Sequence, residues 1–262
     1  MSTVTYAVAD SATLLRRNIK NQLRYPTTAL SIVGIPVLFL LLFVYVFGNV
    51  LGEGVAPLGG GDDYVNYVLP GLIIMTAATG SLGTAVSTSV DMTEGIIARF
   101  KTMAIFRPAI LIARVISSVL QTLTSMALVL AVAWAMGFRP NATAVEWLAA
   151  LALLAAASLA LTWLGVAFGL AAKTLDAASN APFPLILLPF VGSGIVPTDT
   201  MPTGLRYFAE YQPFTPMIET LRGLLLGTEI GNNAWIAVAW CAGLTLLGFV
   251  WAMKHFNKDR TN

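Results

Sequence analysis

Six long apolar stretches constrain the fold of this chain more than any other feature of its sequence. They run approximately from Ala29 to Leu51, Tyr67 to Val90, Ala109 to Gly137, Val145 to Ala172, Pro182 to Val196 and Ala234 to Met253. A helix needs about 20 apolar residues to cross the hydrocarbon core of a bilayer. Only 11% of the residues are charged and 57% are hydrophobic, a composition outside the range of soluble domains. The sequence therefore predicts an all-α polytopic membrane protein with six transmembrane helices.

The distribution of lysine and arginine predicts the orientation of these helices. Of the 15 basic residues, all but Arg139, Arg206 and Arg222 fall on the side of the spans that both termini share. Positive charge is enriched in cytoplasmic loops. We therefore expect a multi-pass membrane protein with both termini in the cytoplasm. Its parts are a cytoplasmic segment (residues 1–28), a membrane domain (29–253) and a cytoplasmic tail (254–262).

The N-terminal segment has the pattern of an amphipathic helix that lies in the membrane interface. Val8, Ala12, Leu15, Ile19 and Leu23 share one side at helical spacing, and four basic residues lie beside and opposite them, namely Arg16, Arg17, Lys20 and Arg24. Pro26 is expected to end this helix. The first apolar stretch is too long for the apolar region of a signal peptide, so we expect this span to be retained.

The fifth apolar stretch differs from the others because it is short and contains four prolines and two glycines, in the run PFPLILLPFVGSGIVP. Proline removes a backbone hydrogen bond, and neighbouring segments must satisfy the freed groups inside a membrane. One regular helix is therefore not expected here. After it, two short helical stretches, Leu205 to Tyr211 and Pro216 to Leu226, are predicted to dip into the outer leaflet as re-entrant helices.

The predicted spans lack the side chains that intramembrane chemistry requires. Apart from Glu146 at the very start of the fourth span, Arg114 near the end of a span is their one charged residue, and the single histidine, His255, lies in the C-terminal tail. This disfavours proton- or ion-coupled pumps and intramembrane hydrolases. Cys241 is the sole cysteine, so neither a disulfide framework nor a cysteine metal site is expected. Ala172 stands before Lys173 where a phosphate-binding loop requires glycine. We expect no metal or cofactor on this chain and no ATP hydrolysis by it.

Small polar residues recur at helical spacing in the second and third spans. The candidates are Thr76, Gly80 and Thr84 in the second span, and Ser117, Gln121 and Thr124 in the third. Such residues pack helices closely and form hydrogen bonds between them. They also provide a weakly polar lining for the passage of an amphiphile, and the two interpretations are compatible.

A short basic segment, EGIIARFKTMAIFRP, separates the second and third spans. On a helical wheel Ile96, Ile97, Phe100 and Met103 cluster on one face, while the charged Glu94, Arg99 and Lys101 lie elsewhere. One interpretation is a loop that is basic because topology requires it. The other is a docking helix whose apolar face enters the groove of a partner. We favour the second, because the chain contains no visible energy source of its own.

At this point the sequence resembles the membrane subunits of type 2 ABC exporters, most closely those of the daunorubicin-resistance type. The similarity is carried by MTEGIIARFKTMAIFRPAILIARVI, by LPGLI at 69–73 and by TMPTGLRYFAEYQPFTPMIETLRGLLLG at 200–227, and it covers nearly the whole chain. The prolines at 182 and 184 depart from the family pattern.

The resemblance implies a permease of a bacterial plasma (inner) membrane. It also implies that this permease pairs with a second membrane subunit and with two cytoplasmic ATPase subunits, which hold ATP and Mg. It implies that residues 94–103 form a coupling helix and that residues 8–24 form an interface helix against the ATPase. Glu94, Arg99, Phe100, Lys101 and Met103 are then the candidates for coupling to the ATPase.

The function expected from these features is ATP-driven export of a lipophilic or amphipathic compound, such as a drug, an antibiotic or a lipid-like metabolite. Three alternatives stay open. A polysaccharide or glycolipid exporter would be favoured by an aromatic-lined channel, yet aromatic residues make up only 10% of the chain and form no evident stripe. A membrane scaffold without transport is the second alternative, and an integral membrane enzyme, disfavoured by the missing acid and base pairs, is the third. Nucleic acid is not an expected partner.

Overall fold

The computed structural model describes residues 26–46, 64–95 and 107–257, and every regular element within these ranges is a helix. In chain order they are α2 (Pro26–Leu41), the π-helical turn η1 (Leu42–Val46), α4 (Tyr64–Thr93), α6 (Arg107–Ala135), α7 (Ala144–Ala171), α8 (Leu175–Asn180), α9 (Phe183–Val191), the 3-10 turn η4 (Thr198–Thr200), α10 (Thr203–Tyr211), α11 (Phe214–Leu226) and α12 (Asn233–Asn257).

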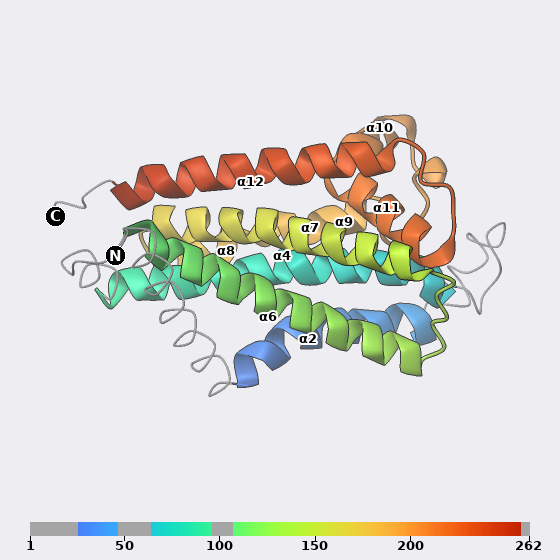
Figure 1. The fold of residues 1–262 in the computed structure, drawn as a ribbon, viewed down its shortest axis with the longest axis horizontal. Coiled ribbons are helices and arrows are strands. Elements are labelled where there is room, and N and C mark those ends of the chain that lie inside the picture. The colour runs from blue at the N-terminus through green and yellow to red at the C-terminus, as the bar shows by residue number, and fades with distance from the viewer. Residues whose placement is uncertain (1–25, 47–63, 96–106, 258–262) are drawn as a thin grey trace.

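The long helices α4, α6, α7 and α12 lie side by side in a bundle, and the short helices α10 and α11 gather at one end of it (Figure 1). We call this the α11 end. The opposite end, where α4 finishes at Thr93, is called the Thr93 end. Both α7 and α12 run from the α11 end to the Thr93 end.

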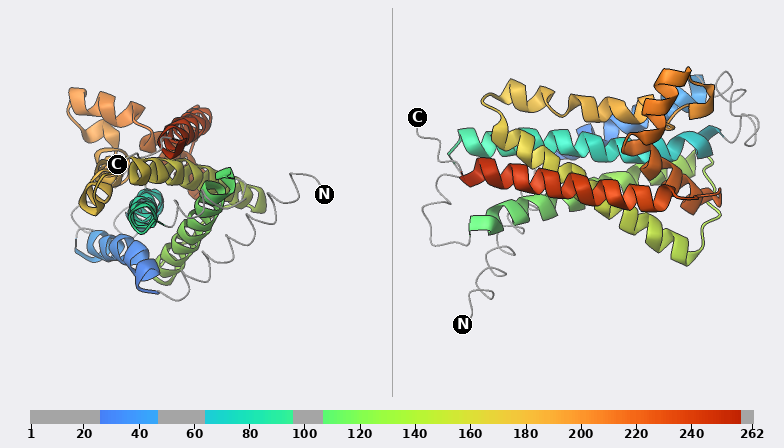
Figure 2. Two further views of the ribbon diagram at one scale, coloured as in Figure 1. Left: turned by 90° about the vertical axis from the view of Figure 1, so that its left-hand side faces the viewer. Right: turned by 90° about the horizontal axis from the view of Figure 1, so that it is seen from above.

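Helix α4 forms the centre of the bundle, with α2, α6, α7 and the α8–α9 region around it (Figure 2). Helix α4 is almost entirely buried inside the bundle, whereas most of α12 is not. Helix α12 instead presents a row of large apolar side chains, including Leu246, Leu247 and Val250, to its surroundings. Because water does not solvate such a surface, α12 is the helix of this set best suited to face lipid.

Glycines allow the central helices to approach closely. A Cβ atom at Gly165 of α7 would collide with the backbone carbonyl oxygen of Ser81 on α4. On the other side of α7, a Cβ atom at Gly248 of α12 would collide with the backbone of Trp163 and Leu164. Small residues at helix crossings give membrane helices their van der Waals contact, since lipid supplies no hydrophobic force between them. These two crossings fix α7 between α4 and α12.

The start of α7 is defined by a capping box. The Thr143 backbone N–H donates to the Glu146 carboxylate at 2.6 Å, and the Glu146 N–H donates to the Thr143 hydroxyl at 3.4 Å. Two backbone donors that would otherwise lack partners are satisfied in this way. Helix α7 therefore begins sharply at Ala144, at the α11 end.

The predicted spans agree with the observed helices to within a few residues where the chain is described. Four helices, Tyr64–Thr93, Leu111–Ala135, Ala144–Ala171 and Asn233–Asn257, are long and apolar enough to cross a membrane. Shorter apolar helical stretches cover Gly34–Val46 and Leu175–Val191. The first predicted span extended to Leu51, and its last residues lie outside the described part of the chain. An all-helical architecture with several apolar helices is thus confirmed.

The proline-rich fifth stretch is divided as its composition predicts. Helix α9 ends at Val191, and the Gly192–Ser193–Gly194 turn follows it. The short helix α8 before it was not predicted, although Thr174 caps it by accepting a hydrogen bond from the N–H of Ala177 at 3.1 Å. The two short helices expected after the fifth stretch are present as α10 and α11.

Candidate functional site

The candidate coupling segment lies almost entirely outside the described residues. This holds for Arg99, Phe100, Lys101 and Met103, and also for the N-terminal candidates Arg16, Arg17, Lys20 and Arg24. Glu94 is described: it is exposed, and its N–H donates to the carbonyl of Val90 at 2.9 Å in the final turn of α4. Gly95 has φ +69°, a left-handed conformation that ends helices. The chain therefore leaves α4 directly at the start of the candidate segment.

An ion pair joins the two helices that flank this segment. The Arg114 guanidinium of α6 pairs with the Asp91 carboxylate in the last turns of α4, and the two side chains are 19% and 23% exposed. Sequence reasoning identified Arg114 only as a charged residue near the end of a span, and it did not identify Asp91. The observed pair neutralises both charges and ties α4 to α6 at the Thr93 end.

The small polar residues of α4 lie in helix contacts inside this chain. Thr76, Gly80 and Thr84 are buried, and a Cβ atom at Gly80 would collide with the Thr122 hydroxyl of α6. Thr76 and Thr84 donate their hydroxyls to the carbonyls of Leu72 and Gly80, one turn earlier, at 2.8 and 2.9 Å. These placements support the helix-packing interpretation for α4. Thr122, whose contact with Gly80 brings α4 and α6 together, was missed in the sequence.

The candidates on α6 do not share one environment. Ser117 is buried and donates to the carbonyl of Arg114 at 2.9 Å, whereas Gln121 is half-buried. Thr124 is exposed on the outside of α6, and its hydroxyl donates to the carbonyl of Leu120 at 2.8 Å. The predicted polar residues of α6 therefore differ in burial: Ser117 lies in the contacts with other helices, and Thr124 lies on the outer surface. A role of these residues in lining a pathway remains a proposal.

A buried arginine at the α11 end connects three segments that are distant in the sequence. Arg222 on α11 is 5% exposed. Its Nη2 atom donates to the carbonyls of Ser193 at 2.7 Å and Tyr67 at 3.1 Å, and its Nη1 atom donates to the Glu219 carboxylate at 2.5 Å. The guanidinium carbon also lies 3.9 Å from the centroid of the Tyr67 ring. We call Arg222, Tyr67, Ser193 and Glu219 the Arg222 clamp.

Side chains of the α10–α11 region satisfy the backbone around the end of α9. The Gln212 amide donates to the carbonyl of Leu188 at 3.2 Å and to the Thr215 hydroxyl at 3.0 Å. The Thr215 hydroxyl in turn accepts from the N–H of Ser193 at 3.4 Å and donates to the carbonyl of Ala209 at 2.5 Å. A backbone broken by proline and glycine is tolerated at membrane depth when protein groups replace its lost partners. Here the Arg222 clamp and Gln212 supply those replacement partners.

Sequence reasoning missed Arg222 because it counted this residue among the loop charges of the outer side. A signal was present, since Glu219 and Arg222 are three residues apart within an apolar helical stretch. That spacing places opposite charges together on one helix face. The pairing with Tyr67 and Ser193 depends on tertiary structure and had no local signal.

Beside the clamp lies a cavity of about 930 Å³ that carries charge of both signs. Its lining includes the carboxylates of Asp199, Glu210, Glu219 and Glu229 and the guanidinium groups of Arg139 and Arg222. Arg206, outside the lining, bridges Asp199 at 2.6 Å and Glu210 at 2.7 Å. Its hydrogen bond with Glu210 raises the pKa of Arg206 above the ordinary value. Within the described ranges, no group of three His, Cys, Asp or Glu side chains is arranged to hold a metal ion.

Comparison with known proteins shows similarity to permease proteins along most of the chain. The chain is 26% identical over 244 residues to the "Daunorubicin resistance ABC transporter permease protein DrrB1" of Streptomyces coeruleorubidus, covering 92% of this chain and 81% of that protein. It is 22% identical over 240 residues to the "Probable doxorubicin resistance ABC transporter permease protein DrrC" of Mycobacterium tuberculosis (strain ATCC 25618 / H37Rv), covering 92% and 85%. The model of the family described as "ABC-2 type transporter" matches residues 11–226, and the chain therefore belongs to that family.

Proposed function

We propose that this chain is the membrane permease subunit of an ATP-driven exporter that moves a lipophilic or amphipathic compound out of a bacterial cell. Membership of the ABC-2 type transporter family carries this proposal. The names of the two relatives attach daunorubicin and doxorubicin resistance to permeases of similar length. A compound of that amphipathic kind is therefore the substrate class that we assign to this chain.

The charges of the described helices support a transporter that takes its energy from a partner. In the described part of the bundle, the one ion pair between long helices, Asp91–Arg114, lies near the Thr93 end, and Arg222 at the α11 end is held by its clamp. The middle of α4 and α7 is lined by apolar and small hydroxyl residues. Such an interior suits passage of an amphiphile, and the energy would come from ATP and Mg bound by ABC ATPase subunits.

The finer architecture belongs to the same proposal. Six spans would be formed by α2 with η1, α4, α6, α7, α8 with α9, and α12, and both termini would be cytoplasmic. Helices α10 and α11 would re-enter the outer leaflet, and a second membrane subunit would complete the pathway. Residues 94–103 would dock on the ATPase, with residues 8–24 as an interface helix beside it. The end of α4 at Gly95 supports this, because the candidate segment begins where α4 ends.

Co-purification with an ABC ATPase encoded next to this chain tests the proposal. We expect the ATPase to remain bound in equal stoichiometry after mild solubilisation, and Arg99→Ala with Phe100→Ala to abolish this binding. Lys173→Ala is the matched control, because Lys173 is an exposed basic residue at the same end of the bundle. Absence of the ATPase under every mild condition, or equal loss in the control, would contradict the proposal.

A further inference from the structure

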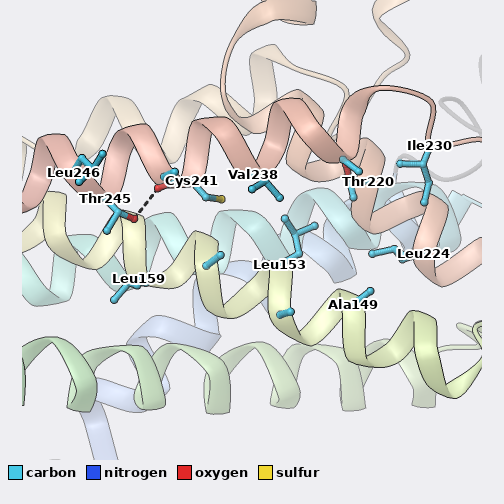
Figure 3. A pocket seen from close by; sticks show the side chains of 14 residues that line it. Ala149, Leu153, Leu159, Thr220, Leu224, Ile230, Val238, Cys241, Thr245 and Leu246 are labelled. Carbon is cyan, nitrogen blue, oxygen red and sulfur yellow. Dashed lines mark hydrogen bonds between the residues drawn. The ribbon is translucent and has the colours of Figure 1, made fainter.

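An apolar groove of about 750 Å³ lies between α7 and α12 (Figure 3) and shares no lining residue with the charged cavity beside the Arg222 clamp. Ala149, Leu153 and Leu159 of α7 form one wall, and Val238 and Leu246 of α12 form the other. Leu224 of α11 lies at one end. Several of these side chains, including Val238 and Leu246, are exposed at the surface of the subunit. The groove therefore opens on the outside of the bundle.

The groove exists because α7 and α12, which pack against each other along much of their length, diverge toward the α11 end. They are in close contact at Gly248, where an added Cβ atom would collide with the backbone of Trp163 and Leu164. Toward the α11 end they separate, and Thr220 and Leu224 of α11 come between them (Figures 1 and 3). Helix α11 thus acts as a wedge, and the groove is the space that this wedge leaves.

The lining offers almost nothing to a polar occupant. None of its residues is charged. Its two hydroxyl groups are already used, because Thr220 donates to the carbonyl of Pro216 at 2.7 Å and Thr245 donates to the carbonyl of Cys241 at 2.7 Å. The remaining polar atom is the weakly hydrogen-bonding sulfur of Cys241. A cavity with such walls is not filled by ordered water, and an occupant that brought a polar group into it would leave that group unsatisfied.

Because the lining is uncharged and its hydroxyl groups are already hydrogen-bonded, it suits a hydrocarbon occupant. The groove opens beside the exposed leucine and valine side chains of α12, on helices that are long and apolar enough to cross a membrane. We propose that it binds one acyl chain of a bilayer phospholipid, which lies along α7 and α12 against Leu224. The chain fills the space beside α11 and thereby supports the helix that carries Arg222.

Retention of phospholipid by the purified full-length protein tests this inference. The protein is delipidated in detergent, reloaded with dioleoylphosphatidylcholine, and examined by native mass spectrometry after removal of free lipid. We expect one tightly held phospholipid per subunit. Ala242→Trp and the milder Ala152→Leu place side chains in the groove and should reduce retention at least tenfold. Ala239→Trp, on the exposed surface of α12 outside the groove lining, should retain lipid like the parent protein.

A second measurement decides the question if the filled variants fold poorly. Added phosphatidylcholine should raise the thermal midpoint of the parent protein and of Ala239→Trp, and should not raise that of Ala152→Leu. Equal retention in all variants, or the absence of bound lipid and of a lipid-dependent midpoint in the parent protein, would overturn the inference. The inference would also be overturned if the parent protein were a dimer, and if Ala242→Trp dissociated that dimer without loss of lipid. A second copy of the chain would then be the occupant of the groove. These outcomes are independent of the co-purification test of the export function.

Discussion

The guanidinium of Arg222 donates a hydrogen bond of 3.1 Å to the backbone carbonyl of Tyr67 and lies 3.9 Å from the centroid of that residue's ring. One side chain of α11 thus holds both the main chain and the side chain at the start of α4. A second donation, to Ser193 at 2.7 Å, adds the turn after α9. A single buried cation therefore joins segments that are far apart in the sequence.

Loss of this cation should destabilise the protein. Arg222→Gln removes donors to two buried carbonyls, and an unsatisfied buried group costs about 1–3 kcal/mol. We expect a lower midpoint in thermal unfolding of the detergent-solubilised protein. Arg206→Gln is the control, because Arg206 forms ion pairs while its side chain is 44% exposed, and exposed pairs contribute little to stability. Equal midpoints for the two variants would contradict the role of the Arg222 clamp.

The α4–α7 crossing should tolerate no added methyl group. Gly165→Ala would bring a Cβ atom against the carbonyl oxygen of Ser81, and overpacking of this kind costs about 1–3 kcal/mol. Gly243 of α12 has no atom near the corresponding position. Gly243→Ala should therefore stabilise the helix by about 0.5–1 kcal/mol. Opposite shifts of the unfolding midpoint are expected, and a neutral Gly165→Ala would show that the two helices can separate without penalty.

The ion pair near the coupling segment should be measurable by a double-mutant cycle. The cycle compares Asp91→Asn, Arg114→Gln and the double variant, and so separates the free energy of the ion pair from the effect of losing each residue alone. We expect a coupling free energy of about 1 kcal/mol, at the upper end of the range for surface pairs. The exposed pair of Arg206 and Glu210 on α10 should give a smaller coupling free energy, because water screens it. An Asp91–Arg114 coupling no larger than that of the exposed pair would indicate that the partly buried position adds nothing.

The proposed orientation can be read with cysteines, because Cys241 is the only native cysteine. In a Cys241→Ala background, Thr174→Cys lies at the Thr93 end and Thr228→Cys at the α11 end, and both threonines are exposed. A membrane-impermeant maleimide on intact cells should label Thr228→Cys and spare Thr174→Cys until the cells are opened. The reverse pattern would invert the topology that the basic residues predict.

The sequence predicts helices well here and contacts poorly. Apolar length determines where a membrane helix is possible, so the ends of α4, α6, α7 and α12 differ from the predicted spans by only a few residues. The prolines and glycines between 182 and 197 likewise predict the interruption of the fifth stretch, because their effect on the backbone is local. Helix α8 was missed, since six residues with a single cap give too weak a signal.

The candidate site depended on long-range contacts that no local pattern contains. The Thr122–Gly80 contact, the Asp91–Arg114 pair and the Arg222 clamp each join residues of different helices. The groove arises from the angle between α7 and α12, which Gly248 and α11 set together. Periodicity identifies which face of a helix is small or polar, but it does not identify the helix that the face meets.

The close crossing at Ser81 and Gly165 gives α4 a mechanical property. Helix α4 is continuous between Tyr67 and Asp91, a span of about 36 Å at 1.5 Å per residue. The crossing lies between these two anchored ends, slightly nearer to Asp91. A rigid helix held in this region, at Ser81 and again one turn later where Gly169 meets Ala85, would pivot about it as a lever about a fulcrum. A sideways push near Asp91 would therefore displace Tyr67, and Arg222 with it, in the opposite direction.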